Sequence, residues 1–385
     1  MRRLVVGLSL AICTLSAAGI TPALAEHRVS AMLGVEGWND NETSLHGALL
    51  LAYDSPPLWR GGTFGAEYNT ETLRLTFNNA RLGERVWLNA QLGAEYGFAG
   101  LLPDYYQDGL RDLSRGFKAG WVQALVNTKF EVAPAAYMEL ELGGRRWIFE
   151  ANDKTDPALV LPPETWVFEP RLRYTGWWLA PDAAWGERHR SYARHRGIAA
   201  GAELGLDMRA TARPWGARAL DPPDPRNDPG QAIVRARQWL RAGWQLDGRV
   251  RTEVLEFAAL GAGEDDLTRD RIGGMNPYVS PLAGAPWASW LSEKYAAVQW
   301  SWHVRVWDDL ELGPLANGVV LVDPDRTGAV EDVGALYGVG ALVDWRRGPW
   351  QVDLRGGWSP GVSERADRPA YSVWLGVGWA QGFGG

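Results

Sequence analysis

The sequence predicts an all-β protein, a transmembrane antiparallel β-barrel of about 16 strands. Three observations predict it: short segments alternate apolar and polar residues, the gaps between them alternate between short and long, and tryptophan is abundant. In 294–306, for example, Val298, Trp300 and Trp302 share one face, while Gln299 and His303 share the other. Strands inside a bilayer persist only in a closed ring, with apolar residues facing lipid at every second position.

The strands are placed where this alternation holds and where turn residues bound it. We expect them near 28–36, 44–53, 61–69, 71–80, 84–97, 118–132, 135–149, 164–178, 195–211, 230–247, 249–260, 293–307, 315–323, 332–346, 349–359 and 370–382.

The gaps follow the loop pattern of an outer-membrane barrel if both chain ends face the periplasm. The odd-numbered gaps, which would then be extracellular, include long ones rich in Gly, Pro and Asp: 98–117, 150–163, 212–229, 261–292 and 360–369. Most even-numbered gaps are tight turns, such as 133–134 and 347–348. The long basic stretch 179–194 is the exception. Either the ninth strand begins earlier, or this turn has a role on the periplasmic side.

Residues 1–25 read as an export signal, and 26–385 as the barrel. Arg2 and Arg3 precede an apolar run at 4–12, and the small residues at 23–25 form a cleavage site. The apolar run is too short to span a bilayer, which takes about 20 apolar residues. We therefore expect localisation in a bacterial outer membrane.

Composition excludes several classes of protein. Cys13, the single cysteine, lies in the signal segment, so the mature chain has no disulfide and no thiol ligand. Without the two arginines of that segment, 37 basic and 46 acidic residues remain, a net charge of −9. Nucleic-acid binding needs clustered Lys and Arg, so we expect no nucleic-acid partner.

The 22 tryptophans favour a membrane barrel, because amphipathic rings form girdles at the two membrane interfaces. Trp38, Trp166, Trp178 and Trp307, for example, lie near predicted strand ends. A tryptophan-rich soluble β-sandwich or propeller is the alternative. The export signal, the loop pattern and the apolar strand faces favour the barrel.

The polar strand faces are strongly charged, so the lumen would be hydrated or hold paired charges. The charged residues are Glu139, Glu141, Glu169, Arg171, Arg173, Glu203, Asp207, Arg209, Arg235, Arg237, Arg241, Arg251, Asp353 and Arg355. Wall salt bridges that neutralise the interior are the favoured interpretation, and a selective ion path is the alternative.

No motif indicates an enzyme, a cofactor or a metal site. The five histidines show no H-x-x-H or H-E-x-x-H spacing, and the sequence contains neither a G-x-S-x-G elbow nor a P-loop. Glycines in strands such as 334–340 fit close interior packing. We expect no catalytic residue, no cofactor and no bound metal.

The last 125 residues resemble the Omp85 superfamily of outer-membrane assembly and translocation barrels. The segments that carry the resemblance are 271–278 (Arg-Ile-Gly-Gly-Met-Asn-Pro-Tyr), 294–299, 317–323, 337–341 and 348–355. At 279–281 the sequence reads Val-Ser-Pro, where the family loop usually carries an Arg-Gly-aromatic tip. The periplasmic POTRA domains that this family normally carries have no counterpart in the sequence, so we expect a barrel without them.

The resemblance implies 16 strands and a long sixth extracellular loop that folds into the lumen between strands eleven and twelve. The longest gap, 261–292, falls between those strands by the count of alternating segments alone. The lumen-loop motif comprises Arg271, Gly273, Gly274, Asn276 and Pro277. The glycine pair allows a turn that a Cβ would hinder. Asp323 and Asp353 are candidate wall partners for Arg271.

The resemblance also implies a weak seam between the first and last strands. Leu33 and Val35 lie on the apolar face of the first strand, and Val377 lies on the corresponding face of the last strand, between Gly376 and Gly378. Glycines weaken strand packing. A seam that opens could pass a protein strand or lipid by edge pairing.

The function implied is membrane-protein or lipid assembly, or translocation, through this seam. The runner-up is a passive pore or small-solute channel, and the third interpretation is a structural or accessory barrel that binds a partner. The expected partners are outer-membrane lipids and a client or periplasmic protein. The sequence assigns no oligomeric state.

Overall fold

The computed structural model describes residues 27–383 with internal gaps. The gaps are 40–43, 70–71, 97–104, 108–109, 113–115, 154, 179–196, 218–226, 276–281, 286–289, 325–330 and 367–368. The expected signal segment and the long basic turn 179–194 therefore lie outside the described residues.

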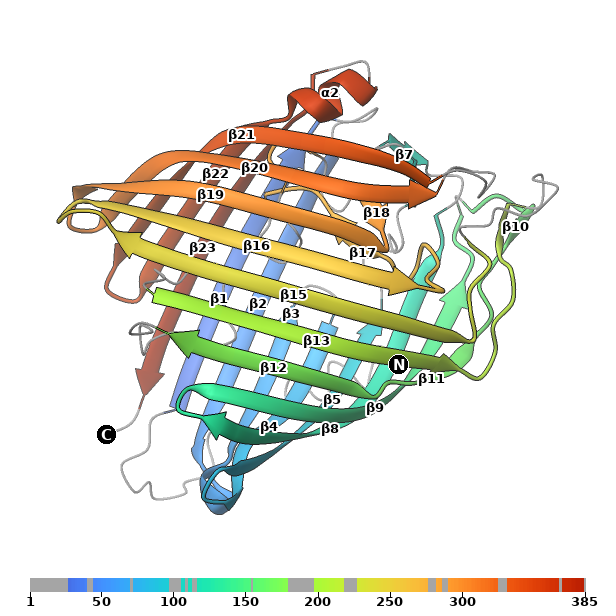
Figure 1. The fold of residues 1–385 in the computed structure, drawn as a ribbon, viewed down its shortest axis with the longest axis horizontal. Coiled ribbons are helices and arrows are strands. Elements are labelled where there is room, and N and C mark those ends of the chain that lie inside the picture. Colours follow the sequence, from blue (N-terminus) through green and yellow to red (C-terminus); the bar gives the residue numbers. More distant parts are fainter. Residues whose placement is uncertain are drawn as a thin grey trace.

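The described strands form one closed antiparallel barrel of 16 strands, as the sequence predicts (Figure 1). They are β1 (His27–Trp38), β2 (Ser44–Pro57), β3 (Thr63–Asn69), β4 (Thr72–Gly83), β5 (Val86–Tyr96), β8 (Lys118–Ala133), β9 (Ala136–Glu150), β11 (Thr165–Phe168) continued by β12 (Arg171–Trp178), β13 (Gly197–Arg209), β15 (Ala232–Gln245), β16 (Val250–Ala262), β19 (Lys294–Trp307), β20 (Leu310–Pro324), β21 (Glu331–Arg347), β22 (Trp350–Trp358) and β23 (Tyr371–Phe383).

Each strand pairs with its neighbours along the chain, and β1 pairs with β23 to close the ring. β11 and β12 count as one barrel strand because both lie between β9 and β13. The break falls at Pro170, which has no N–H to donate to a ladder.

Every predicted strand segment overlaps one barrel strand. The largest difference is at β20, which begins at Leu310 rather than at residue 315. Gly313 and Pro314 read as a turn in the sequence but lie inside this strand. A Cβ on Gly313 would come within 1.9 Å of the Trp302 carbonyl oxygen, so the glycine serves close strand approach.

The two faces of the barrel strands differ as the alternation predicts. On β19, Val298 and Trp300 are 47% and 50% exposed, whereas Ser301 and His303 are 4% and 5% exposed. The exposed apolar face is the surface that a bilayer would cover. Among the described residues, no helix is both long and apolar enough to cross a membrane.

Short elements occur between the barrel strands. They are η1 (Trp59–Gly61), β6 (Tyr105–Gln107), β7 (Leu110–Asp112), β10 (Leu159–Val160), β14 (Gly216–Ala217), β17 (Asp270–Ile272), β18 (Trp290–Ser292) and α2 (Pro360–Ala366). All except η1 fall in odd-numbered gaps, and α2 lies at one end of the barrel (Figure 1). These elements are not predicted from the sequence, because two to seven residues carry too little periodicity.

Candidate functional site: the lumen loop and the closing seam

The segment 263–293, which joins β16 to β19, is the centre of the candidate site; we call it the lumen loop. Its described residues contact side chains on the inner face of the barrel on both sides of the ring. It begins on the charged wall formed by β13 and β15, and it ends against β19, β20 and β21.

Ion pairs hold the start of the lumen loop to the charged wall. Arg209 of β13 donates to both carboxylate oxygens of Asp265, at 3.0 and 2.9 Å. Arg235 of β15 pairs with Glu264, and Arg237 Nε donates to Asp270 Oδ2 at 3.0 Å. These bonds are charge-assisted and partly buried, so they fix the loop more firmly than surface pairs would.

Two acidic groups at this anchor titrate differently. Burial raises the pKa of Glu264 to about 7, against the attraction of Arg235. Burial also disfavours the charged form of Asp265, but hydrogen bonds from Arg209, Thr268 and Trp215 hold its pKa below the ordinary value. The lowered pKa keeps Asp265 ionised at neutral pH, whereas Glu264 titrates near neutral pH.

The predicted glycine pair forms a turn that requires glycine. Gly273 and Gly274 have φ angles of 125° and 89°, a region that residues with a Cβ rarely adopt. The turn leads directly to Met275, whose backbone N–H donates to Glu36 Oε1 of β1 at 2.5 Å. The glycine turn therefore places a backbone N–H of the loop within hydrogen-bonding distance of a carboxylate on the first strand.

Further along, the loop backbone bonds to two more wall side chains. The N–H of Ala283 donates to Asn317 Oδ1 of β20 at 3.0 Å, and that of Gly284 donates to Ser372 Oγ of β23 at 3.1 Å. The lumen loop is thereby hydrogen-bonded to both strands of the closing pair, through Glu36 on β1 and Ser372 on β23.

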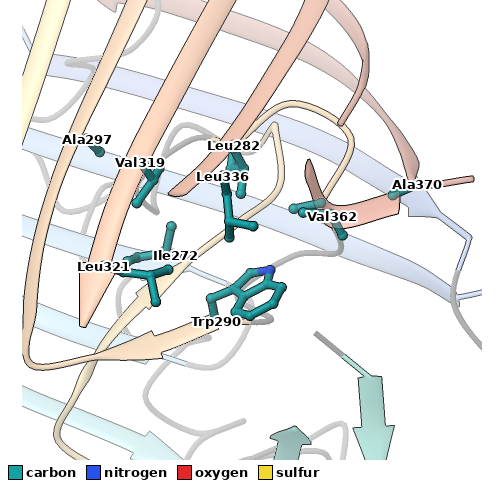
Figure 2. Packing of buried hydrophobic residues seen from close by; sticks show 10 residues of the cluster. Ile272, Leu282, Trp290, Ala297, Val319, Leu321, Leu336, Val362 and Ala370 are labelled. Carbon is teal, nitrogen blue, oxygen red and sulfur yellow. The ribbon is translucent and has the colours of Figure 1, made fainter. Parts of the chain in front are cut away.

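Apolar packing covers the end of the loop (Figure 2). The loop residues Ile272, Leu282 and Trp290 are at most 2% exposed and pack against inner-face residues of β19, β20 and β21 and against α2. The cluster also includes the wall residues Ala297, Val319, Leu321 and Leu336, together with Val362 of α2 and Ala370, which directly precedes β23.

A second apolar cluster joins the loop to the seam itself. Met275 and Ala283 pack with Met32 of β1 and Trp374 of β23. The cluster is completed by Ala48, Leu50, Leu315 and Leu342. Wall glycines make room for the loop: a Cβ on Gly338 would lie 2.2 Å from the Ala283 carbonyl oxygen. The inner wall is therefore shaped for this loop segment.

The predicted seam residues lie on two strands that pair directly, in a register that the sequence left open. Leu33 is opposite Val377, Gly34 is opposite Gly376, and Met32 is opposite Gly378. Val35 is opposite Leu375, and Leu33, Val35, Leu375 and Val377 are all exposed on the lipid side.

Pairing at the seam is continuous from His27–Phe383 to Trp38–Ser372, so the two strands are paired along their full length. What distinguishes the seam is its inner surface. Trp374 is fully buried, and its ring lies where a Cβ on Gly34 would come within 2.1 Å of it.

The charged inner wall forms the network expected from the sequence. Glu141 pairs with Arg171 at 3.4 Å and with Arg173 at 2.8 Å, and Asp207 pairs with Arg235 at 2.9 Å. Further pairs join Glu169 to Arg145 and Arg171, Glu203 to Arg173 and Arg237, Glu253 to Arg241 and Arg251, and Asp353 to Arg355.

The predicted loop partners are only partly described. Arg271 lies in β17, opposite Leu291 of β18. Asp353 is fully buried, and Arg355 Nε lies 3.1 Å from its Oδ1. Asn276, Pro277 and the side chain of Asp323 lie outside the described residues.

Sequence reasoning missed the residues that hold the loop. Pairing between the acidic residues 264–266 and the arginines within 209–237 could have been predicted, because the opposite charges of the two segments can be read from the sequence. Glu36 and Ser372 gave no such signal, because each accepts a backbone N–H from a residue distant in the chain.

Three solved structures show what this fold resembles. BamA from Haemophilus ducreyi, in a form lacking POTRA domains 1–3, matches with a TM-score of 0.61 and 10% identity, over 97% of this chain and 78% of that chain. CdiB from Acinetobacter baumannii matches with a TM-score of 0.55 and 8% identity, over 92% and 60% of the two chains. CdiB from Escherichia coli gives 0.56 and 12%, over 94% and 64%. The fold of this chain is therefore similar to that of the BamA and CdiB barrels.

BamA and CdiB are bacterial outer-membrane barrels rather than enzymes. This chain spans less than two thirds of either CdiB chain. No family model matches the sequence, and no curated protein matches it. At 8–12% identity the likeness establishes the fold alone.

Proposed function

We propose that this chain is an exported outer-membrane barrel that assists the assembly or translocation of membrane proteins or lipids through the β1–β23 seam. One observation carries the proposal: the lumen loop is hydrogen-bonded to Glu36 on one seam strand and to Ser372 on the other. A change in the loop therefore acts on both edges at once.

Opening the seam would expose two unpaired strand edges. An exposed edge can pair with an incoming strand by β-augmentation, and the gap beside it can admit lipid. The proposed partners are accordingly outer-membrane lipids and a client protein, with or without a periplasmic partner. The wide apolar outer face of β1 and β23 suits a lipid-bounded opening.

A disulfide lock tests the proposal. Directly opposed residues have Cβ atoms about 4.5–5.5 Å apart, near the separation that a disulfide bridges. Leu33→Cys with Val377→Cys should cross-link under oxidation, as should a neighbouring pair such as Val35→Cys with Leu375→Cys. The matched control keeps Leu33→Cys but pairs it with Leu49→Cys across β1 and β2, which leaves the seam free.

The readout is the rate at which a urea-denatured eight-stranded reporter barrel folds into phosphatidylethanolamine–phosphatidylglycerol vesicles containing this protein. The wild type should accelerate folding, the seam lock should abolish that acceleration, and reduction should restore it. The β1–β2 lock should leave the rate unchanged. Equal acceleration by the oxidised seam lock would refute opening of the seam.

The charged wall favours a passive pore as the second candidate, because charged lumen residues set ion preference. A pore should conduct equally well with the seam locked. An accessory barrel that only binds a partner should neither conduct nor accelerate folding.

A further inference from the structure

A buried cluster near the 308–309 turn is not used by the loop or the seam. His303 of β19, Glu311 of β20 and Asp344 of β21 are each at most 6% exposed. One ligand-type atom from each lies within 4.8 Å of the other two. The strand register brings them together, because Glu311 pairs with Asp344 and with Arg305, two residues from His303.

The imidazole has a defined orientation. His303 Nε2 lies 3.1 Å from Ser301 Oγ, which can accept its N–H. In the tautomer in which Ser301 accepts this N–H, the lone pair of Nδ1 is directed at Asp344 Oδ2, 3.4 Å away, and at Glu311 Oε2, 3.8 Å away. Nδ1 is buried and makes no hydrogen bond. A lone pair that faces two carboxylates is unfavourable unless a proton or a metal ion lies between them, and a metal ion would bind all three groups at once.

The separations suit a metal ion. Ligands about 2.0–2.2 Å from a tetrahedral Zn²⁺ lie about 3.4 Å from one another, so one ion can reach Nδ1 and both carboxylate oxygens after small side-chain adjustments. We propose that His303, Glu311 and Asp344 form a site for Zn²⁺ or a similar divalent first-row metal ion.

The donor set determines the class of ion. One imidazole nitrogen with two carboxylates suits Zn²⁺ and its neighbours, whereas Ca²⁺ takes six to eight oxygen ligands and Mg²⁺ prefers oxygen in octahedral geometry. Charged neighbours surround the site: Arg251 Nη2 lies 3.3 Å from Glu311 Oε2, and Glu253 Oε2 lies 3.9 Å from His303 Nε2. Asp353 faces Asp344 across the register of β21 and β22.

Such an ion would join three consecutive strands at one end of the barrel. No pattern in the sequence indicates this site, because the ligands come from three strands and match no linear metal motif. Ser301 would act as a positioning residue, since partners of the second imidazole nitrogen fix its orientation toward a metal.

The experiment titrates the full-length folded barrel, stripped with chelator, with Co²⁺ and Zn²⁺, using Mg²⁺ as the negative probe. The wild type should bind one equivalent of Co²⁺, with the visible absorption of a tetrahedral site, and Zn²⁺ should displace it. Loss of a positioning partner typically lowers metal affinity 10–100-fold, so Ser301→Ala should weaken binding about 10-fold and His303→Gln at least about 100-fold.

The matched control is His27→Gln, because the His27 ring hydrogen-bonds Tyr53 instead of facing this cluster. Heat-modifiable migration verifies that each variant is folded, and Asp344→Asn replaces His303→Gln if the latter does not fold. Absence of the tetrahedral Co²⁺ spectrum in the wild type would overturn the proposal, as would equal affinity in wild type and His303→Gln. Either result would leave the seam proposal intact.

Discussion

The inner wall of the barrel has two contrasting regions, and the lumen loop lies across both. From β9 to β16 the wall carries alternating arginines and carboxylates, such as Arg173 between Glu141 and Glu203. On β1, β2, β20, β21 and β23 the region that meets the loop is mostly apolar and includes Leu50 and Trp374. Ion pairs bind the start of the loop to the wall, and apolar packing binds its middle and end.

This difference separates two tasks. Buried ion pairs demand exact geometry and give register, but they contribute little net stability against desolvation. Apolar packing is less directional and contributes in proportion to the area removed from water, about 25 cal/mol per Å². We infer that the charged anchor determines where the loop enters the lumen, and that the apolar region stabilises the closed seam.

Removing the loop should give the largest effect. Deleting 268–286 removes Met275, Ala283 and the contacts to both seam strands, while it keeps the anchor at Asp265. We expect the single-channel conductance in planar bilayers to rise several-fold, because the deletion empties the part of the lumen that these residues fill. A folded, heat-modifiable deletion protein with wild-type conductance would contradict this account of the loop as a plug.

Next in size is the effect of weakening the apolar region at the seam. Trp374→Ala removes a fully buried ring that covers Gly34, and such truncations cost about 3–5 kcal/mol. The matched control is Trp350→Ala on β22, whose side chain is half-exposed on the lipid side. Urea unfolding in vesicles measures both. Equal destabilisation by the two variants would show that the inner surface of the seam is not special.

The same contrast explains what could be predicted from the sequence. Strand positions and the lipid-facing placement of Leu33 and Val377 follow from period-two alternation, which a bilayer enforces on every strand; the Leu33–Val377 register does not, because a shift by two residues keeps the same face. The charged wall follows for the same reason, since lumen residues alternate with lipid-facing ones. Each charged residue on the inner face can therefore be predicted from its position in the alternating pattern.

The loop contacts could not be derived in this way. The bond from Met275 to Glu36 depends on a backbone N–H, which every residue except proline has, so no side-chain pattern marks it. Gly273 and Gly274 were identified because a positive φ leaves a residue-specific signature. The carboxylate that pairs with a given arginine is harder to predict. Asp353, a candidate partner of Arg271, pairs with Arg355 on its own strand.

The smallest effect should come from titrating the charged anchor. Burial raises the pKa of Glu264 to about 7 in the folded protein, against an ordinary value of 4.5. Between these two pH values the folded state holds a proton that the unfolded state has released, so stability falls as pH rises from about 4.5 to about 7. The groups that face Glu264 are Arg235, Arg237 and Asp270.

The expected loss is at most about 3 kcal/mol, because the folded-state pKa of about 7, which already includes the attraction of Arg235, lies well above 4.5 and each pKa unit corresponds to about 1.4 kcal/mol. Urea unfolding in vesicles between pH 5 and pH 8 measures it. Glu264→Gln cannot ionise at this position and should flatten the profile. Asp265 provides no competing signal in this range, because its pKa is held below the ordinary value. A profile that is equally steep in Glu264→Gln would place the titrating group elsewhere, and the loop would then enter the lumen without a pH-sensitive contact.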